Sequence, residues 1–270
     1  EDLSHSHNYG SSQGDIMLRR KIWSNPDEVI FANGAKQLIY MSLRAVTQPG
    51  DDVVLIGPCW ASFTKICELL GLKVTLLTGD DGYYCPDIKK VDSAVTPKTA
   101  AIVINNPNNP TGYVYGKEYM DALLEISRKN DCYIISDEIY RYLVDGEKFY
   151  SLRGNPSVIT IDGFSKSLNI TGWRAGYIIA NAEIIEALTG IQSQMSGPPS
   201  TLIQQILTGA WDDIKVASFD DYRDRVDLLC ELEKFREHRP MAAFYFYLPI
   251  DDRWKDTKEL CEYLLKEHKV

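Results

Sequence analysis

Seven short runs of apolar and β-branched residues recur along the first 180 residues, and polar alternation does not break them. They cover residues 28–34, 52–57, 73–79, 99–105, 132–137, 158–164 and 174–180. Longer stretches with helical periodicity lie between several of them, at residues 35–47, 62–70 and 117–129. Continuous apolar strands that alternate with helices predict an α/β fold, with a mainly parallel sheet covered by helices on both faces.

The last part of the chain has a different pattern, which is mostly helical from residue 184 onward. Residues 220–235 predict a charged amphipathic helix, residues 242–250 a strand, and residues 257–270 a second helix. This pattern indicates a second, smaller α+β unit. We therefore predict a large domain over residues 9–220, and part of a small C-terminal domain over residues 221–270.

Composition and charge argue against several classes of function. A net charge of −9 disfavours binding to the phosphate backbone of nucleic acids. No apolar run reaches the length of a transmembrane helix, and no secretory leader is visible. The six cysteines are scattered without a CxxC pair, and no HExxH motif is present, so we predict no metal site. We expect reduced thiols, a cytoplasmic location, and neither a membrane nor a nucleic acid as partner.

Residues with useful chemistry follow the predicted strands directly. In an open parallel sheet, ligands bind at the carboxyl ends of the strands, so we expect these side chains to gather along one edge. They are Gly34, Ala35 and Lys36 after the first strand, Trp60 after the second, Asn109 after the fourth, Asp137 and Tyr140 after the fifth, and Ser165 and Lys166 after the sixth.

Pyridoxal phosphate is a ligand that needs this set of groups. Its aldehyde requires an amine, which Lys166 would supply as a Schiff base. Its ring nitrogen stays protonated beside an anion, for which Asp137 is the candidate. Asn109 and Tyr140 could donate to the 3-oxygen of the ring, and Trp60 could stack on its face.

The phosphate of such a cofactor needs a helix N-terminus and a fixed cation. Gly34, Ala35 and Lys36 open a predicted helix and would supply backbone N–H groups. Arg174, in the segment GWRAGY, would supply a guanidinium.

Three motifs carry a family resemblance. The segments NNPNNPTG, SDEIY and GFSKSLNITGWRAGY, in that order, resemble the class I/II aminotransferases, which are fold-type I pyridoxal-phosphate enzymes. The stretches NGAKQLIYMSL and PGDDVVLIGPCWASF look like the aspartate/prephenate aminotransferase subgroup. The resemblance extends over about residues 9–248. It implies a seven-stranded sheet in the large domain and a homodimer with its active sites at the subunit interface.

The resemblance also implies roles for individual residues. Lys166 matches the Schiff-base lysine, Asp137 the partner of the pyridinium, and Asn109 and Tyr140 the donors to the 3-oxygen. Arg174 matches a phosphate ligand.

Four further positions matter for the phosphate and the substrate. Ser165 matches a serine often found on the phosphate, whereas Gly163 stands where the family commonly has a second hydroxyl. Tyr9 matches a tyrosine that reaches the phosphate of the neighbouring subunit. Members that favour acidic substrates resemble this chain in having a lysine at the position of Lys36, where its charge can meet a distal carboxylate.

The sequence is shorter than complete members of the family. They have an N-terminal arm ahead of the NYGSSQG region and a C-terminal strand pair, with an arginine that clamps the substrate α-carboxylate. Neither is found here, and Arg253 lies too early to be that arginine, so we interpret it as a surface charge. The stretches 17–29 and 208–222 also look compressed. We expect a chain that is incomplete at both termini and that lacks internal segments.

Simpler explanations exist for several of these residues. Asp137 could be a helix N-cap, Asn109 a turn residue and Trp60 a core residue. Lys36 could be a charge on a helix surface, and Arg174 a partner in a structural salt bridge.

The functional hypothesis is an aminotransferase that moves an amino group from an amino acid to a 2-oxo acid. Aspartate or another acidic amino acid is the expected donor, and 2-oxoglutarate the expected acceptor; aromatic, alanine and kynurenine substrates stay open. The alternatives are a carbon–sulfur β-lyase of the same fold and a non-catalytic regulator domain that binds pyridoxal phosphate. The acidic charge argues against the regulator.

Overall fold

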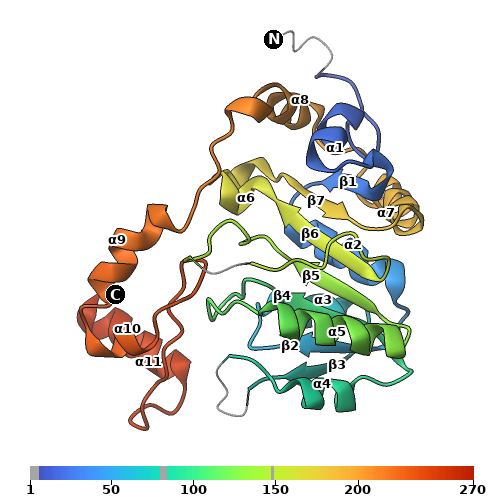
Figure 1. Ribbon diagram of the computed structural model, residues 1–270. Coiled ribbons are helices and arrows are strands. Elements are labelled where there is room, and N and C mark those ends of the chain that lie inside the picture. Colours follow the sequence, from blue (N-terminus) through green and yellow to red (C-terminus); the bar gives the residue numbers. More distant parts are fainter. Residues whose placement is uncertain (1–5, 80–83, 147–148) are drawn as a thin grey trace.

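A seven-stranded sheet forms the centre of the computed structural model, which describes residues 6–79, 84–146 and 149–270 (Figure 1). The strand order is β1-β7-β6-β5-β4-β2-β3. Each strand lies within one of the seven predicted runs, so the predicted sheet is confirmed. The strands are β1 (Val29–Ala32), β2 (Asp52–Ile56), β3 (Lys73–Leu77), β4 (Thr99–Asn105), β5 (Tyr133–Asp137), β6 (Val158–Gly163) and β7 (Gly176–Ile179).

Because most strands are parallel, their carboxyl ends lie along one edge of the sheet. Strands β3, β2, β4, β5 and β6 are parallel, whereas β7 runs antiparallel to both β6 and β1. Strand β1 therefore runs parallel to β6. The segments that follow β1, β4, β5 and β6, and the segment that precedes β7, consequently meet at the same edge of the sheet.

Helices occur both around the sheet and in the C-terminal part of the chain. The sheet region contains α1 (Ile16–Ile22), α2 (Ala35–Val46), α3 (Ser62–Leu69), α4 (Ile88–Ala94), α5 (Lys117–Lys129), α6 (Phe164–Ser167), α7 (Ala182–Met195) and α8 (Thr201–Gly209). The C-terminal part contains α9 (Asp220–Leu229), α10 (Glu233–Glu237) and α11 (Thr257–Tyr263), which continues as a π-helical turn, Leu264–His268. Short 3-10 turns lie at Pro26–Glu28, Thr171–Trp173 and Trp211–Asp213. None of the helices in the described ranges is both long and apolar enough to cross a membrane.

Apolar cores cover both faces of the sheet, and a third cluster packs α1 and α8 against β1 and β7. Along β2, Val53 and Leu55 belong to the core beneath α2, α3 and α7, whereas Val54 and Ile56 belong to the core beneath α4 and α5. Successive strand residues point to opposite faces, so a strand buried on both sides must be apolar throughout. This explains the unbroken apolar runs in the sequence.

The C-terminal part differs from its sequence-based prediction in two places. The predicted strand over residues 242–250 is wrong, because its backbone forms only an isolated bridge between Ala242 and Val144 among the described residues. Ala243 has a left-handed φ of 60°, which interrupts the extended run. The predicted helix over residues 220–235 is broken between α9 and α10, where the Arg236 guanidinium donates to the Cys230 carbonyl oxygen.

Helices α9, α10 and α11 lie together to one side of the sheet (Figure 1). Backbone hydrogen bonds from Ala243 N to Leu143 O and from Ala217 N to Ser167 O connect this part of the chain to the sheet region. The division at residue 220 into two domains stays a prediction.

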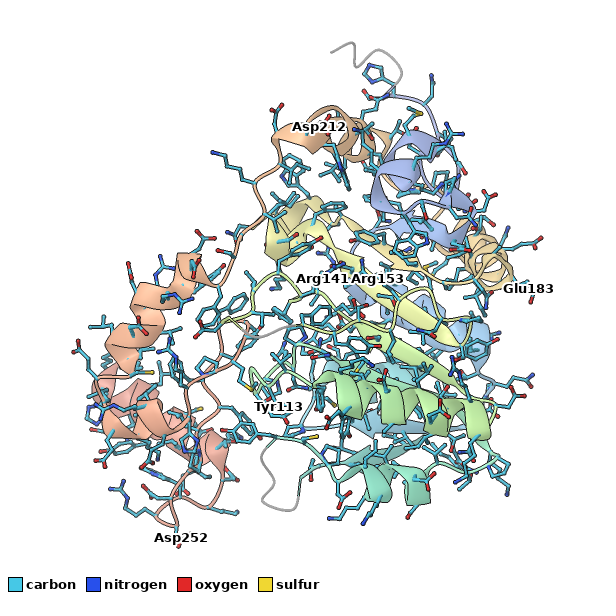
Figure 2. All side chains as sticks on the ribbon, in the orientation of Figure 1. Tyr113, Arg141, Arg153, Glu183, Asp212 and Asp252 are labelled. Carbon is cyan, nitrogen blue, oxygen red and sulfur yellow. The ribbon has the colours of Figure 1, made fainter. Side chains whose placement is uncertain are left out.

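A buried cluster of charges fixes the ends of β5 and β6. Glu138 and Asp162 have no exposed side-chain surface, and Arg153 Nη2 lies 2.9 Å from Glu138 Oε2 and 3.3 Å from Asp162 Oδ2. Arg141 Nη1 lies 3.5 Å from the same oxygen of Asp162, and Figure 2 shows the two arginines side by side. The Tyr177 hydroxyl donates to Asp162 Oδ2 at 2.8 Å. Two carboxylates are thus matched by two guanidinium groups.

Removing one partner from this cluster should be costly. Arg153→Met would leave two buried carboxylates short of a cation, so we expect the free energy of unfolding to fall by about 3–5 kcal/mol. Urea denaturation near neutral pH measures this. Arg128→Met is the matched control, because Arg128 pairs with Glu125 on the surface and should matter little. Equal losses in the two variants would contradict this account.

Candidate active site

A cleft at the edge where the strand ends meet is lined by nine of the predicted site residues. Three residues that the sequence analysis did not single out, Asn105, Ile139 and Thr171, line it as well. The predicted residues in its wall are Ala35, Lys36, Trp60, Asn109, Asp137, Tyr140, Ser165, Lys166 and Arg174. The parallel strands therefore bring together groups that are up to 139 residues apart in the sequence.

Lys166 lies in the short helix α6, which begins directly after β6. Its side chain is half-buried, and its Nζ lies 5.5 Å from the ring centroid of Phe244 and 6.0 Å from that of Tyr140. Burial, and secondly the nearby Arg174, lower the pKa of Lys166. A lowered pKa favours the neutral amine, which is the nucleophilic form.

Asp137 ends β5 and lies deep in the cleft. Its side chain is buried, and its Oδ1 accepts a hydrogen bond from Ile139 N at 3.2 Å. Burial raises the pKa of Asp137 to about 7, and the neighbouring carboxylates Asp162 and Glu138 act in the same direction. The ionised form is therefore costly unless a cation comes close, and a protonated ring nitrogen is such a cation.

The loop after β4 is held by its own asparagines. Asn105 Nδ2 donates to the Asp137 carbonyl at 2.9 Å, and Asn105 Oδ1 accepts from Asn109 N at 2.7 Å. Asn109 Nδ2 in turn lies 3.4 Å from the Tyr140 hydroxyl. Asn105 thus connects the ends of β4 and β5 and holds the backbone of Asn109, whose side chain lines the cleft. Its position at a strand end would have identified it by the rule that selected the other residues.

One end of the cleft has the groups that an anion needs. The Ser165 hydroxyl is buried and has no hydrogen-bond partner among the residues that the structure describes. Arg174 donates from Nη1 to Thr171 O at 2.9 Å, and its guanidinium packs on Gly34, which precedes α2. Gly34 has a φ of 86°, a backbone conformation that favours glycine, and an added Cβ there would lie 2.6 Å from Arg174 Nη2. An unpartnered hydroxyl, a guanidinium and a helix N-terminus fit a phosphate.

The glycine that replaces the expected second hydroxyl has a structural reason. A Cβ at Gly163 would lie 2.8 Å from both the Ala175 carbonyl oxygen and the Gly176 Cα, at the start of the neighbouring strand β7. Close contact between β6 and β7 thus excludes a side chain at this position.

Trp60 and Lys36 also line the cleft. Trp60 packs edge-on against Phe63, with ring centroids 5.8 Å apart. Lys36, in the first turn of α2, places its Nζ 4.8 Å from the Trp60 ring centroid. A cation over the face of an indole is favourable, so the charge of Lys36 is held at the mouth of the cleft.

Two predicted residues lie outside the lining. Gly34 is behind Arg174, as described above, and Tyr9 is 93% exposed in the segment ahead of α1. Arg253 pairs with Asp251 on the surface, in agreement with its interpretation as a surface charge. Within residues 6–79, 84–146 and 149–270, no group of three or more histidine, cysteine, aspartate or glutamate side chains is arranged to hold a metal ion.

Comparison with known proteins places this fold and cleft in a family. The family described as aminotransferase class I and II matches residues 2–270. The chain is 35% identical over 254 residues to an aspartate aminotransferase of Thermotoga maritima, covering 91% of this chain and 67% of the relative. It is 34% identical over 253 residues to an aspartate/prephenate aminotransferase of Thermus thermophilus, covering 89% of this chain and 66% of that relative.

A solved structure agrees with the sequence relatives. An aromatic aminotransferase from Pyrococcus horikoshii superposes with a TM-score of 0.88 at 29% identity, covering 99% of this chain and 78% of that one. The chain belongs to the class I and II aminotransferase family. The predicted family, fold class and cofactor, pyridoxal phosphate, are thereby confirmed. The chain spans about two thirds of the length of the two curated relatives.

The burial of Asp137 gives a prediction about stability. Its pKa is about 7 in the folded protein and 3.8 ordinarily, so the folded protein binds this proton more tightly than the unfolded chain. Stability from the protonated carboxyl is complete below about pH 4 and is lost as the pH rises through about 7. In the cofactor-free protein, Asp137→Asn should therefore raise the free energy of unfolding at about pH 8, by a few kcal/mol at most.

Urea unfolding of both proteins at about pH 8 and about pH 4 measures this difference. The gain should nearly vanish at the lower pH, where the folded protein keeps the carboxyl protonated and the unfolded chain, with a pKa of 3.8, is only partly ionised. An equal gain at both pH values would contradict the assigned cause. The same substitution should weaken the binding of pyridoxal phosphate.

Proposed function

We propose that this chain catalyses pyridoxal-phosphate-dependent transamination between an amino acid and a 2-oxo acid. The observation that carries the proposal is the meeting of Lys166, the buried Asp137 and the unpartnered Ser165 hydroxyl in one cleft. An amine with a lowered pKa, a carboxylate that lacks a cation and an anion site are what this cofactor requires. When bound, the cofactor supplies an aldehyde that condenses with amines and a ring that accepts the electron pair released at the amino-acid α-carbon.

Lys166 has two tasks in this proposal. Its amine holds the cofactor until the amino group of the substrate displaces it. The freed Nζ then takes the proton from the substrate α-carbon and returns it at the former aldehyde carbon. Its half-buried position beside Phe244 and Tyr140 lowers the pKa of the amine, which favours the neutral form that can act as a base.

The other residues bind and orient. Asp137 holds the proton on the ring nitrogen, where the positive charge is needed. Asn109 and Tyr140, which lie beside each other in the cleft, would donate to the 3-oxygen of the ring, and Trp60 would cover one face. Ser165, Arg174 and the N–H groups at the start of α2, after Gly34, bind the phosphate.

We further propose an acidic amino donor, aspartate being the first choice, and 2-oxoglutarate as acceptor. The support is the charge of Lys36 at the mouth of the cleft, together with the names of the curated relatives. The Pyrococcus relative, an aromatic aminotransferase, makes aromatic donors the natural comparison.

We also propose a homodimer in the cytoplasm, whose protomers have a large domain over residues 9–220 and a small one from residue 221. Tyr9 is 93% exposed and Met17 is 52% exposed, and a second copy of the chain would cover them. Tyr9 would then reach the phosphate in the neighbouring subunit.

The first test replaces the proposed catalytic amine. Lys166→Ala should abolish both the visible absorption of the bound cofactor and the transfer of amino groups from aspartate to 2-oxoglutarate. Lys129→Ala is the control, because Lys129 pairs with Asp92 on the surface. Transamination at the native rate in Lys166→Ala would refute the mechanism. If the unmodified protein released pyruvate and ammonia from cystathionine and did not transaminate, it would instead be identified as a β-lyase.

The second test concerns the substrate. Lys36→Gln keeps the length of the side chain approximately but removes its charge. We expect kcat/KM for aspartate to fall roughly 10- to 100-fold, the worth of one charge-assisted hydrogen bond, with little change for phenylalanine. Lys65→Gln, on the exposed side of α3, is the control. A parallel loss for both amino acids would show that Lys36 does not select the acidic substrate.

A further inference from the structure

The segment after residue 240 reaches the cleft from the C-terminal part of the chain. Phe244 lies next to the amine of Lys166, and the Tyr245 hydroxyl lies 2.7 Å from the Tyr140 hydroxyl. Tyr245 does not line the cleft itself, and it touches the site through Tyr140. Tyr245 is half-buried.

The Tyr140 hydroxyl has one proton and two neighbours. The Asn109 amide nitrogen, 3.4 Å away, can only donate, so the Tyr140 oxygen accepts there. Between Tyr140 and Tyr245 either hydroxyl could be the donor. Burial raises the pKa of Tyr140 far above its usual range, so this phenol keeps its proton at physiological pH. The direction in which that proton points decides whether it is available to a ligand in the cleft.

We propose that Tyr245 is a positioning residue that donates its hydroxyl proton to the Tyr140 oxygen, and thereby turns the Tyr140 proton toward the 3-oxygen of the bound cofactor. This inference rests on the proposed function. If Tyr140 donates to the cofactor, its hydroxyl cannot also donate to Tyr245, so Tyr245 must be the donor in the 2.7 Å contact. A hydroxyl that accepts a hydrogen bond becomes a better donor, so the contact also strengthens the bond that Tyr140 makes.

Packing holds the two phenols in this arrangement. The rings of Tyr140 and Tyr245 meet edge to face, with centroids 5.7 Å apart and an interplanar angle of 80°. Phe244 contacts both Tyr140 and Tyr222. The backbone of Ala243 is fixed by its hydrogen bond to Leu143 O at 2.7 Å. The contact between the hydroxyls therefore joins two side chains whose rings are already immobilised.

Other charged and titratable groups face Tyr140 from several elements. Asp137 comes from β5 and Lys166 from α6, while Lys36 and Arg174 lie across the cleft. Tyr222 from α9 lies behind Phe244. The substitution Tyr245→Phe keeps the ring and leaves all these groups in place. It therefore removes only the Tyr245 hydroxyl.

The test is the pH dependence of the visible absorption of the protein loaded with pyridoxal 5′-phosphate. Donors to the 3-oxygen stabilise its negative charge and lower the pKa of the nitrogen that joins Lys166 to the cofactor. Tyr245→Phe should weaken the Tyr140 donor and raise the midpoint of the spectral change by roughly half a pH unit to one unit, the worth of one hydrogen bond.

Two further variants show that Tyr245 acts through Tyr140. Tyr140→Phe should raise the midpoint by more, and the double variant Tyr140→Phe with Tyr245→Phe should have the midpoint of Tyr140→Phe alone. Tyr222→Phe is the matched control, because its hydroxyl contacts Asn169 and not Tyr140, and its midpoint should stay native. Tyr245→Leu removes the ring as well and gives a second measurement of the same shift.

The outcomes separate this inference from the proposed function. A native midpoint in Tyr245→Phe and Tyr245→Leu would overturn the inference while leaving the cofactor site intact. Additive shifts in the double variant would also overturn it, because Tyr245 would then act independently of Tyr140. Absence of any visible band in the unmodified protein would contradict the proposed function itself, and the inference with it.

Discussion

The site depends on the parallel register at the ends of β4, β5 and β6. In that register Asn105 pairs with Asp137, and Asp137 pairs with Ile161. A slip of one residue would turn Asp137 to the other face of the sheet, because side chains alternate along a strand. The contact between Asn105 Nδ2 and the Asp137 carbonyl, and the buried charge cluster just beyond, hold this register at the point where a shift would matter most.

Two kinds of buried charge lie next to each other and have opposite consequences. Glu138 and Asp162 are matched by Arg153 and Arg141, so their burial is compensated within the chain. Asp137 has no such cation beside it in the described part of the chain, and its raised pKa reflects the cost of burial. The protein thus contains a rigid, neutralised cluster immediately behind an uncompensated carboxylate. A cofactor with a protonated ring nitrogen would supply the missing charge, which links stability to cofactor binding.

The C-terminal part of the chain contributes to the site although it lies beside the sheet. Ala217 N donates to Ser167 O, next to Lys166, and the segment at Ala243 is bound to the loop after Tyr140. The hydroxyl contact between Tyr245 and Tyr140 continues this connection into the cleft. The C-terminal part of the chain is therefore in contact with Tyr140, one of the residues proposed to hold the cofactor.

The sequence by itself determined the strands, the main helices and the chemistry at the strand ends. Unbroken apolar runs are typical of strands buried on both faces, and residues such as Asp137 and Lys166 follow those runs directly. Tertiary structure alone decided that β7 is antiparallel, that residues 242–250 pair with no strand among the described residues, and that Tyr245 meets Tyr140. Local sequence patterns indicate which residues are buried and whether the spacing of apolar residues fits a helix or a strand. They do not report which distant segment supplies the partner, because that choice is made by the packing of the whole chain.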